Sequence, residues 1–211
     1  MAEELAKRVV FSPIMSQQLM QKHVESIQTR FNSASPEERD TGLNWYRRAH
    51  EEAFKLGKGD VKKGAGIISA LSPSMEWTRN IRAAKELVRT GTTAHHMAHV
   101  NTVDKAKRIL DGEDPDGLFS FKSGPKTLNF YQNIVDPENP TPITIDRHAY
   151  DIAVDNKGEM THVLKGQMKG PKYRHFADAY RNAAHELGMP IPNQVQAVTW
   201  GTQLKGRQAN G

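Results

Sequence analysis

The sequence predicts an all-α fold, and three observations support this prediction. Helix-start signals are present, as at Ser35-Pro36-Glu37-Glu38, where a serine cap precedes a proline and two acids. Apolar residues recur at helical spacing in several segments. The apolar run 195–200 also fits a strand, but Pro192 just before it favours a helix.

Taken in order, these signals place three helices and two loops along the chain. The helix that begins after Ser35 is expected to run to Leu56 and to end at Gly57. A second helix spans 76–88, with an apolar stripe made by Trp77, Ile81, Ala84 and Val88. Asn101 is expected to cap a third helix, which contains Val103, Ala106 and Leu110. The turn-rich segments 111–116 and 136–142 are expected to be loops.

The clearest helix is 171–187. Its apolar residues share one face, and Gly188 and Pro190 follow its end. These residues are Tyr173, Phe176, Ala177, Tyr180, Ala183, Ala184 and Leu187.

Composition limits the possible classes of protein. A chain of 211 residues suits one domain, or two small lobes that share a core. It contains no cysteine, which excludes disulfides, thiolate metal sites and iron–sulfur clusters. No apolar run is long enough to span a bilayer, and the first residues do not have the pattern of a secretory signal. An intracellular, cytoplasmic protein without membrane partners is expected.

The positive charge is unevenly distributed. The formal net charge is +5, and residues 162–211 carry seven Lys/Arg against two acids, so residues 1–161 are neutral overall. A basic surface on one side suits a polyanion such as nucleic acid. Ordinary solubilising charge is the alternative explanation.

The first candidate functional segment is Ser123-Gly124-Pro125-Lys126-Thr127. It predicts a tight turn that opens a helix, with Leu128, Tyr131 and Val135 facing inward. Unpaired backbone N–H groups at such a helix start bind phosphate, and a nearby lysine strengthens the contact. The spacing of a nucleotide-binding P-loop is absent.

The second segment is Ile145-Asp146-Arg147-His148. Asp146 is predicted either to cap a helix or to face a cleft, where it would activate water or stabilise a cationic sugar. His148 is expected to be packed or hydrogen-bonded. His95, His96 and His99 lack a carboxylate at zinc-site spacing, so no metal site is predicted.

The third segment runs from Gly66 to Trp77, where a buried helix ends in a polar turn and a new helix begins. One interpretation is a simple helix–turn–helix corner with Trp77 in the core. The other is that four side chains line a pocket or form a wedge that enters DNA. These are Ser72, Ser74, Trp77 and Asn80.

Together the three segments resemble the helix-hairpin-helix DNA glycosylases related to endonuclease III. In that family a helix ending in a leucine-serine-alanine-type turn comes first. A Gly-x-Gly-x-Lys-Thr hairpin follows, and an apolar-Asp-x-His segment then bears the catalytic aspartate. This chain has Ile68-Ser69-Ala70-Leu71-Ser72, then the 123–127 and 145–148 segments, in the same order. The resemblance covers residues 64–153.

The resemblance implies a two-lobed helical fold with the active-site cleft between the lobes. One lobe would comprise residues 60–160 and carry the hairpin, and the other residues 1–59 and 161–211. Asp146 would be catalytic, and Lys126 would take the place of the Schiff-base lysine of bifunctional members. Such an enzyme would act on double-stranded DNA as a monomer without a cofactor.

Further roles follow from the same resemblance. A flipped-out base would stack on Trp77 or Tyr131, and Asn80, Asn129 or Gln196 would read its edge, with His148 also in the pocket. Lys126 would contact phosphate only or attack C1′, and phosphate contact is favoured. The remaining DNA contacts are expected from Lys122, Ser123, Gly124, Thr127, Arg147, Lys172 and Arg174.

The chain departs from the family pattern at three points, which affect the expected substrate more than the expected scaffold. Lys122 stands at the hairpin's first glycine, Ser72-Pro73 replaces the glutamine that often follows the first helix, and there is no cysteine for an iron–sulfur cluster. The segment 194–200 looks closer to glycosylase-like enzymes of phages, some of them implicated in hypermodifying thymine. A base-modifying enzyme on this scaffold and a non-catalytic DNA-binding protein are therefore the alternatives.

Overall fold

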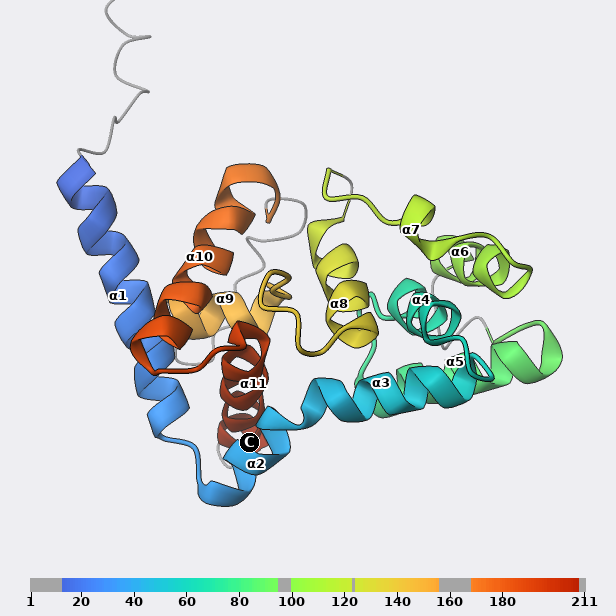
Figure 1. Cartoon of the computed structure of the whole chain (residues 1–211), viewed down its shortest axis with the longest axis horizontal. Helices are drawn as coiled ribbons and strands as arrows, with labels where there is room; N and C mark the ends of the chain where they lie inside the picture. The colour runs from blue at the N-terminus through green and yellow to red at the C-terminus, as the bar shows by residue number, and fades with distance from the viewer. Residues whose placement is uncertain (1–12, 95–99, 123, 156–167, 209–211) are drawn as a thin grey trace, which may run out of the picture.

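The computed structural model of the chain describes residues 13–94, 100–122, 124–155 and 168–208. These residues form helices and no strands, so the predicted all-α class is confirmed (Figure 1). The helices are α1 (Pro13–Asn32), α2 (Pro36–Leu43), α3 (Trp45–Leu56), α4 (Val61–Leu71), α5 (Trp77–Thr90), α6 (Val100–Leu110), α7 (Pro115–Leu118), α8 (Pro125–Val135), α9 (Arg147–Ala153), α10 (Gly170–Glu186) and α11 (Pro192–Gln208).

The buried apolar side chains form two clusters. The first cluster joins α3, α4, α5, α6 and α8. The second joins α1, α9, α10 and α11, together with Ile143 and Ile145 from the segment before α9. In Figure 1 the helices of the two clusters lie on opposite sides of the molecule. Helix α11 contributes to both, because Ala197 belongs to the first cluster and its neighbour Val198 to the second.

The helix predicted from Ser35 to Leu56 is divided in two at Asn44. Its start is as expected: the Ser35 hydroxyl accepts the Glu38 N–H, and the Glu38 carboxylate accepts the Ser35 N–H. At Asn44 the chain leaves α2, and α3 begins at the next residue. Since α2 packs on α11 and α3 packs on α4, the two segments serve different cores. Helical spacing does not reveal this change of direction.

Most other helix boundaries agree with the sequence to within one or two residues, but the loop predicted over 111–116 is partly wrong, because Asp114 caps the short helix α7 that begins at Pro115. Glu76 caps α5, and Gly91 ends it in the left-handed conformation. The segment 195–200 is helical, within α11. Asn101 does not cap a helix, because it lies inside α6. No helix in the described part of the chain is both long and apolar enough to cross a membrane.

Candidate active site

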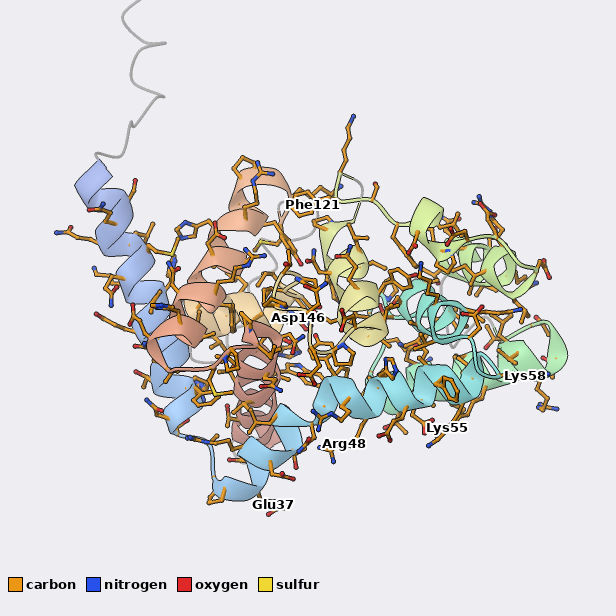
Figure 2. The ribbon with its side chains drawn as sticks, in the orientation of Figure 1. Glu37, Arg48, Lys55, Lys58, Phe121 and Asp146 are labelled. Atoms are coloured by element: carbon orange, nitrogen blue, oxygen red, sulfur yellow. The ribbon has the colours of Figure 1, made fainter. Side chains whose placement is uncertain are left out.

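A cavity of about 860 Å³ lies where helices of both core clusters meet. The first residues of α3, α5, α8 and α9, together with α11, contribute to its wall. Met168 and Lys169, which precede α10, also line it. Several helix N-termini therefore converge on one space. The carboxylates of Glu76 and Asp146 cap α5 and α9, whereas the N-terminus of α8 has no side-chain cap and favours negative charge. Asp146, on this wall, lies near the middle of the molecule in Figure 2.

Asp146 both caps α9 and lines the cavity. Its Oδ1 accepts the Ala149 N–H at 2.8 Å, so the predicted capping role is confirmed. The residue is half-buried. The charge of Asp146 also helps to raise the pKa of three buried tyrosines, Tyr46, Tyr173 and Tyr180, for which burial is the larger cause. One carboxylate oxygen is thus held by the backbone while the group borders a space large enough for a ligand.

Lys126 lies on the same wall, in the first turn of α8. Gly124 is the N-cap of α8 and provides no side-chain hydrogen bond to the helix start. No carboxylate of the described residues is within ion-pair distance of Lys126. The ammonium group and the α8 N-terminus are therefore available to an anionic group in the cavity.

All three tryptophans of the chain line this cavity. Trp45 is central, with its ring centroid 4.9 Å from that of Trp77 and 5.6 Å from that of Trp200. The Phe130 ring is 6.1 Å from Trp45, which extends the aromatic wall onto α8. Trp77 is half-buried and packs on the first core cluster, so its core and pocket interpretations both describe it. Such a wall suits a flat, weakly polar ring.

The corner between α4 and α5 supplies the polar part of the wall. Ser72, Ser74 and Asn80 all line the cavity. The Ser72 hydroxyl donates to the Ser69 carbonyl at 2.9 Å, which fixes it in place. Ser74 has φ 60°, a left-handed conformation that is uncommon for residues other than glycine. The corner is therefore held in one specific shape.

Gln196 reaches the cavity from α11 and is held by Tyr46. The buried Tyr46 hydroxyl donates to Gln196 Oε1 at 3.1 Å. Burial raises the pKa of Tyr46 above its usual range, so the hydroxyl stays protonated. Close by, Asn133 Nδ2 donates to Thr144 Oγ1 at 3.0 Å. These bonds connect α3, α8, α11 and the segment before α9 beneath the cavity floor.

Two predicted substrate contacts do not line this cavity. The Asn129 side chain is buried and bonded at both ends: Nδ2 donates to the Pro125 carbonyl at 2.7 Å, and Oδ1 accepts the Ile143 N–H at 3.1 Å. The Tyr131 hydroxyl donates to Asp116 at 2.7 Å and borders a separate hollow of about 180 Å³. Both side chains therefore make their contacts outside the cavity in which a base was expected to be read or stacked.

Of the residues predicted to contact DNA, some line the cavity and others lie outside it. Gly124 and Arg147 line the cavity, and His148 lines it beside Trp200, with the two ring centroids 6.5 Å apart. Lys122 is exposed and Thr127 half-buried, and both lie outside the cavity wall. Lys172 lies over the Tyr150 ring and Arg174 over the Phe121 ring, also outside the wall. Ser123 is outside the described residues.

The sequence reasoning missed several residues of the site. These are Trp45, Tyr46, Met75, Glu76, Pro125, Phe130, Thr144, Ile145, Met168, Lys169, Ala197 and Trp200. Trp45 and Trp200 are far apart in the sequence and follow no shared motif. The only available signal was the rarity of tryptophan in this chain.

A comparison with family models matches residues 12–208 to a model described as "Family of unknown function (DUF7178)". Searches of curated proteins and of solved structures find no match to the chain.

Proposed function

Because the chain belongs to this family of unknown function, we propose its activity from the cavity itself: it binds DNA, flips out a base and cleaves the N-glycosidic bond. One observation carries the proposal. Asp146, whose Oδ1 is held by the helix backbone, shares a cavity of about 860 Å³ with Lys126 and all three tryptophans. A carboxylate beside an aromatic wall suits a reaction in which a flat base leaves and a cationic sugar forms.

The proposed step is hydrolysis at C1′ of the sugar. The C1′–N bond breaks, and the departing base takes the bonding electron pair and a proton from solvent, to which Asp146 later returns the proton that it takes from water. Asp146 stabilises the positive charge that develops on the sugar and accepts a proton from the attacking water, whose oxygen bonds to C1′. Three cations on the wall, Lys126, Arg147 and Lys169, hold the neighbouring phosphates.

Asparagine at position 146 provides the sharpest test. Asn caps helices about as well as Asp, so Asp146→Asn keeps the α9 cap and removes only the charge. We expect the variant to fold normally and to lose at least a hundredfold in the rate of abasic-site formation, measured as alkali-labile breaks in duplexes with normal or modified bases. Asp60→Asn is the matched control, since Asp60 caps α4 in the same way and is not part of the cavity wall.

A second test addresses Lys126. If its amine displaces the base at C1′, borohydride traps the resulting imine as a covalent protein–DNA adduct. If Lys126 only contacts phosphate, no adduct forms, and Lys126→Gln weakens binding without altering the chemistry. We favour phosphate contact, because Lys126 lies in the first turn of a helix whose N-terminus has no side-chain cap.

The size of the cavity favours one alternative function. At about 860 Å³ it is in the upper part of the range of about 300–1,000 Å³ found for small-molecule sites. It therefore has room for a second small substrate, as an enzyme that modifies a base in place would require. Such an enzyme leaves no abasic sites. Tight binding with no breaks on any duplex would exclude the glycosylase and leave the modifying enzyme or a non-catalytic DNA-binding protein.

A further inference from the structure

Two polar atoms in the walls of the cavity have no hydrogen-bond partner among the described residues. They are Asn80 Oδ1 and Trp200 Nε1, and both are buried. The orientation of the Asn80 amide is determined by its other end, because Nδ2 donates to the Ile68 carbonyl at 3.0 Å and an oxygen could not replace it there. The acceptor of Asn80 therefore remains unused.

Unpaired buried polar atoms are rare in native proteins, since they have lost their bonds to water and gained nothing in return. Here one acceptor and one donor are left over in the walls of the same cavity. Asn80 is 1% exposed and comes from the first turns of α5, whereas Trp200 comes from α11. A ligand that offers one N–H and one acceptor would satisfy both.

We propose that Asn80 and Trp200 determine specificity by reading the polar edge of the base: Asn80 Oδ1 accepts an N–H of the ring edge, and Trp200 Nε1 donates to a neighbouring ring or carbonyl acceptor. The identification of the ligand as a nucleobase rests on the proposed function. The pairing of one donor with one acceptor rests on the two unpartnered atoms.

The side-chain amides of Asn129 and Gln196, which were also predicted to read a base, are less suited to this role. Both ends of Asn129 are bonded to backbone groups. Gln196 Oε1 already accepts the Tyr46 hydroxyl. Of the three amides, Asn80 is the one whose oxygen has no partner.

The three tryptophans make the inference directly measurable, because every indole of the chain lines the cavity. Ligand binding should therefore change the intrinsic fluorescence. The probes are nucleoside pairs in which methyl groups replace the edge N–H hydrogens: thymidine and N3-methylthymidine, adenosine and N6,N6-dimethyladenosine, cytidine and N4,N4-dimethylcytidine. Free N-acetyltryptophanamide corrects for absorption by the nucleosides.

We expect at least one unmethylated nucleoside to bind about tenfold more tightly than its methylated partner. Asn80→Leu should abolish that preference. Trp200→Phe retains an aromatic ring and two other indoles, so it should keep the preference while weakening the unmethylated nucleoside about tenfold.

The inference is overturned if the wild-type protein binds no nucleoside, if it prefers no unmethylated partner, or if Asn80→Leu keeps the preference. The wild-type comparison needs no variant, so misfolding of Asn80→Leu would not prevent a decision. Failure of the proposed function would look different. A clear preference without strand breaks on any duplex would exclude the glycosylase and retain the edge-reading pair.

Discussion

The Tyr46 hydroxyl donates to Gln196 Oε1 at 3.1 Å, and this buried bond joins α3 of the first core cluster to α11 beneath the candidate active site. Tyr46→Phe would leave the Gln196 oxygen buried without a donor. We expect the free energy of unfolding to fall by about 1–3 kcal/mol, measured by urea denaturation.

A double variant separates the cost of leaving the Gln196 oxygen without a donor from the cost of removing the Tyr46 hydroxyl. Tyr46→Phe with Gln196→Leu removes both polar partners, so part of the lost stability should return. Tyr131→Phe is the matched control at a partly buried bond, because its acceptor Asp116 keeps the ion pair with Lys62. That change should cost less than Tyr46→Phe, and equal costs would contradict the importance assigned to the buried bond.

Gly42 allows α2 to approach α11 closely. A Cβ at this position would lie 2.7 Å from the Val198 backbone nitrogen and closer still to its Cα. Because backbone cannot move aside as a flexible side chain can, Gly42→Ala should lower the free energy of unfolding by about 1–3 kcal/mol. Thermal unfolding monitored by circular dichroism would measure the loss.

Gly201, in α11 itself, provides the opposite control. Nothing lies within 4 Å of a Cβ built there, and the residue is inside the helix. Gly201→Ala should therefore stabilise the protein by up to about 1 kcal/mol. If Gly201→Ala also destabilised the protein, the loss at Gly42 would reflect a general sensitivity of the α2–α11 region and not the close contact with Val198.

The all-α fold could be predicted from the sequence because its signals are local. Ser35 caps α2 as expected, and Pro192 begins α11. The break at Asn44 was missed because it depends on which core each segment packs against. Local spacing does not contain that information.

The candidate site was partly predictable for the same reason. Asp146, Lys126 and Asn80 lie at helix starts or corners that leave a sequence signal, and they do line one cavity. Trp45 and Trp200 join them only through long-range packing. Conversely, Asn129 follows Lys126 closely in the sequence, yet its side chain is used to hold the backbone of Pro125 and Ile143.

The cations of the cavity wall should account for part of the salt dependence of DNA binding. We expect Lys126→Gln, Arg147→Gln and Lys169→Gln each to weaken binding at low salt and to reduce the slope of log K against log salt by about 1. Fluorescence anisotropy with a labelled duplex, titrated at several salt concentrations, would measure both quantities.

Lys58 is the matched control for these substitutions. It is exposed in the turn between α3 and α4, at the end of α3 far from Asp146 in Figure 2. Lys58→Gln should leave the slope unchanged. A slope reduced by Lys58→Gln but not by the three cavity variants would place the DNA on another surface.

His23 should make the stability of the fold depend on pH. It is buried between α1 and α10, with its Nδ1 2.9 Å from His175 Nε2. Burial, with a smaller contribution from His175, lowers the pKa of His23 from its ordinary 6.5 to about 4. Between these values the unfolded chain binds a proton that the folded chain does not, so stability should fall as pH decreases from 6.5 towards 4.

The loss should approach about 3 kcal/mol at the lower limit, because each pKa unit corresponds to about 1.4 kcal/mol. Urea unfolding at pH 7, 6 and 5 would measure the beginning of this loss of stability at pH values where most carboxylates are still ionised. His175, whose pKa is also lowered by burial, contributes in the same direction, whereas Asp178 opposes it. His23→Leu should make the free energy of unfolding depend less on pH over this interval. If the stability of His23→Leu fell in parallel with that of the wild type, the His23–His175 pair would not be the source of the dependence.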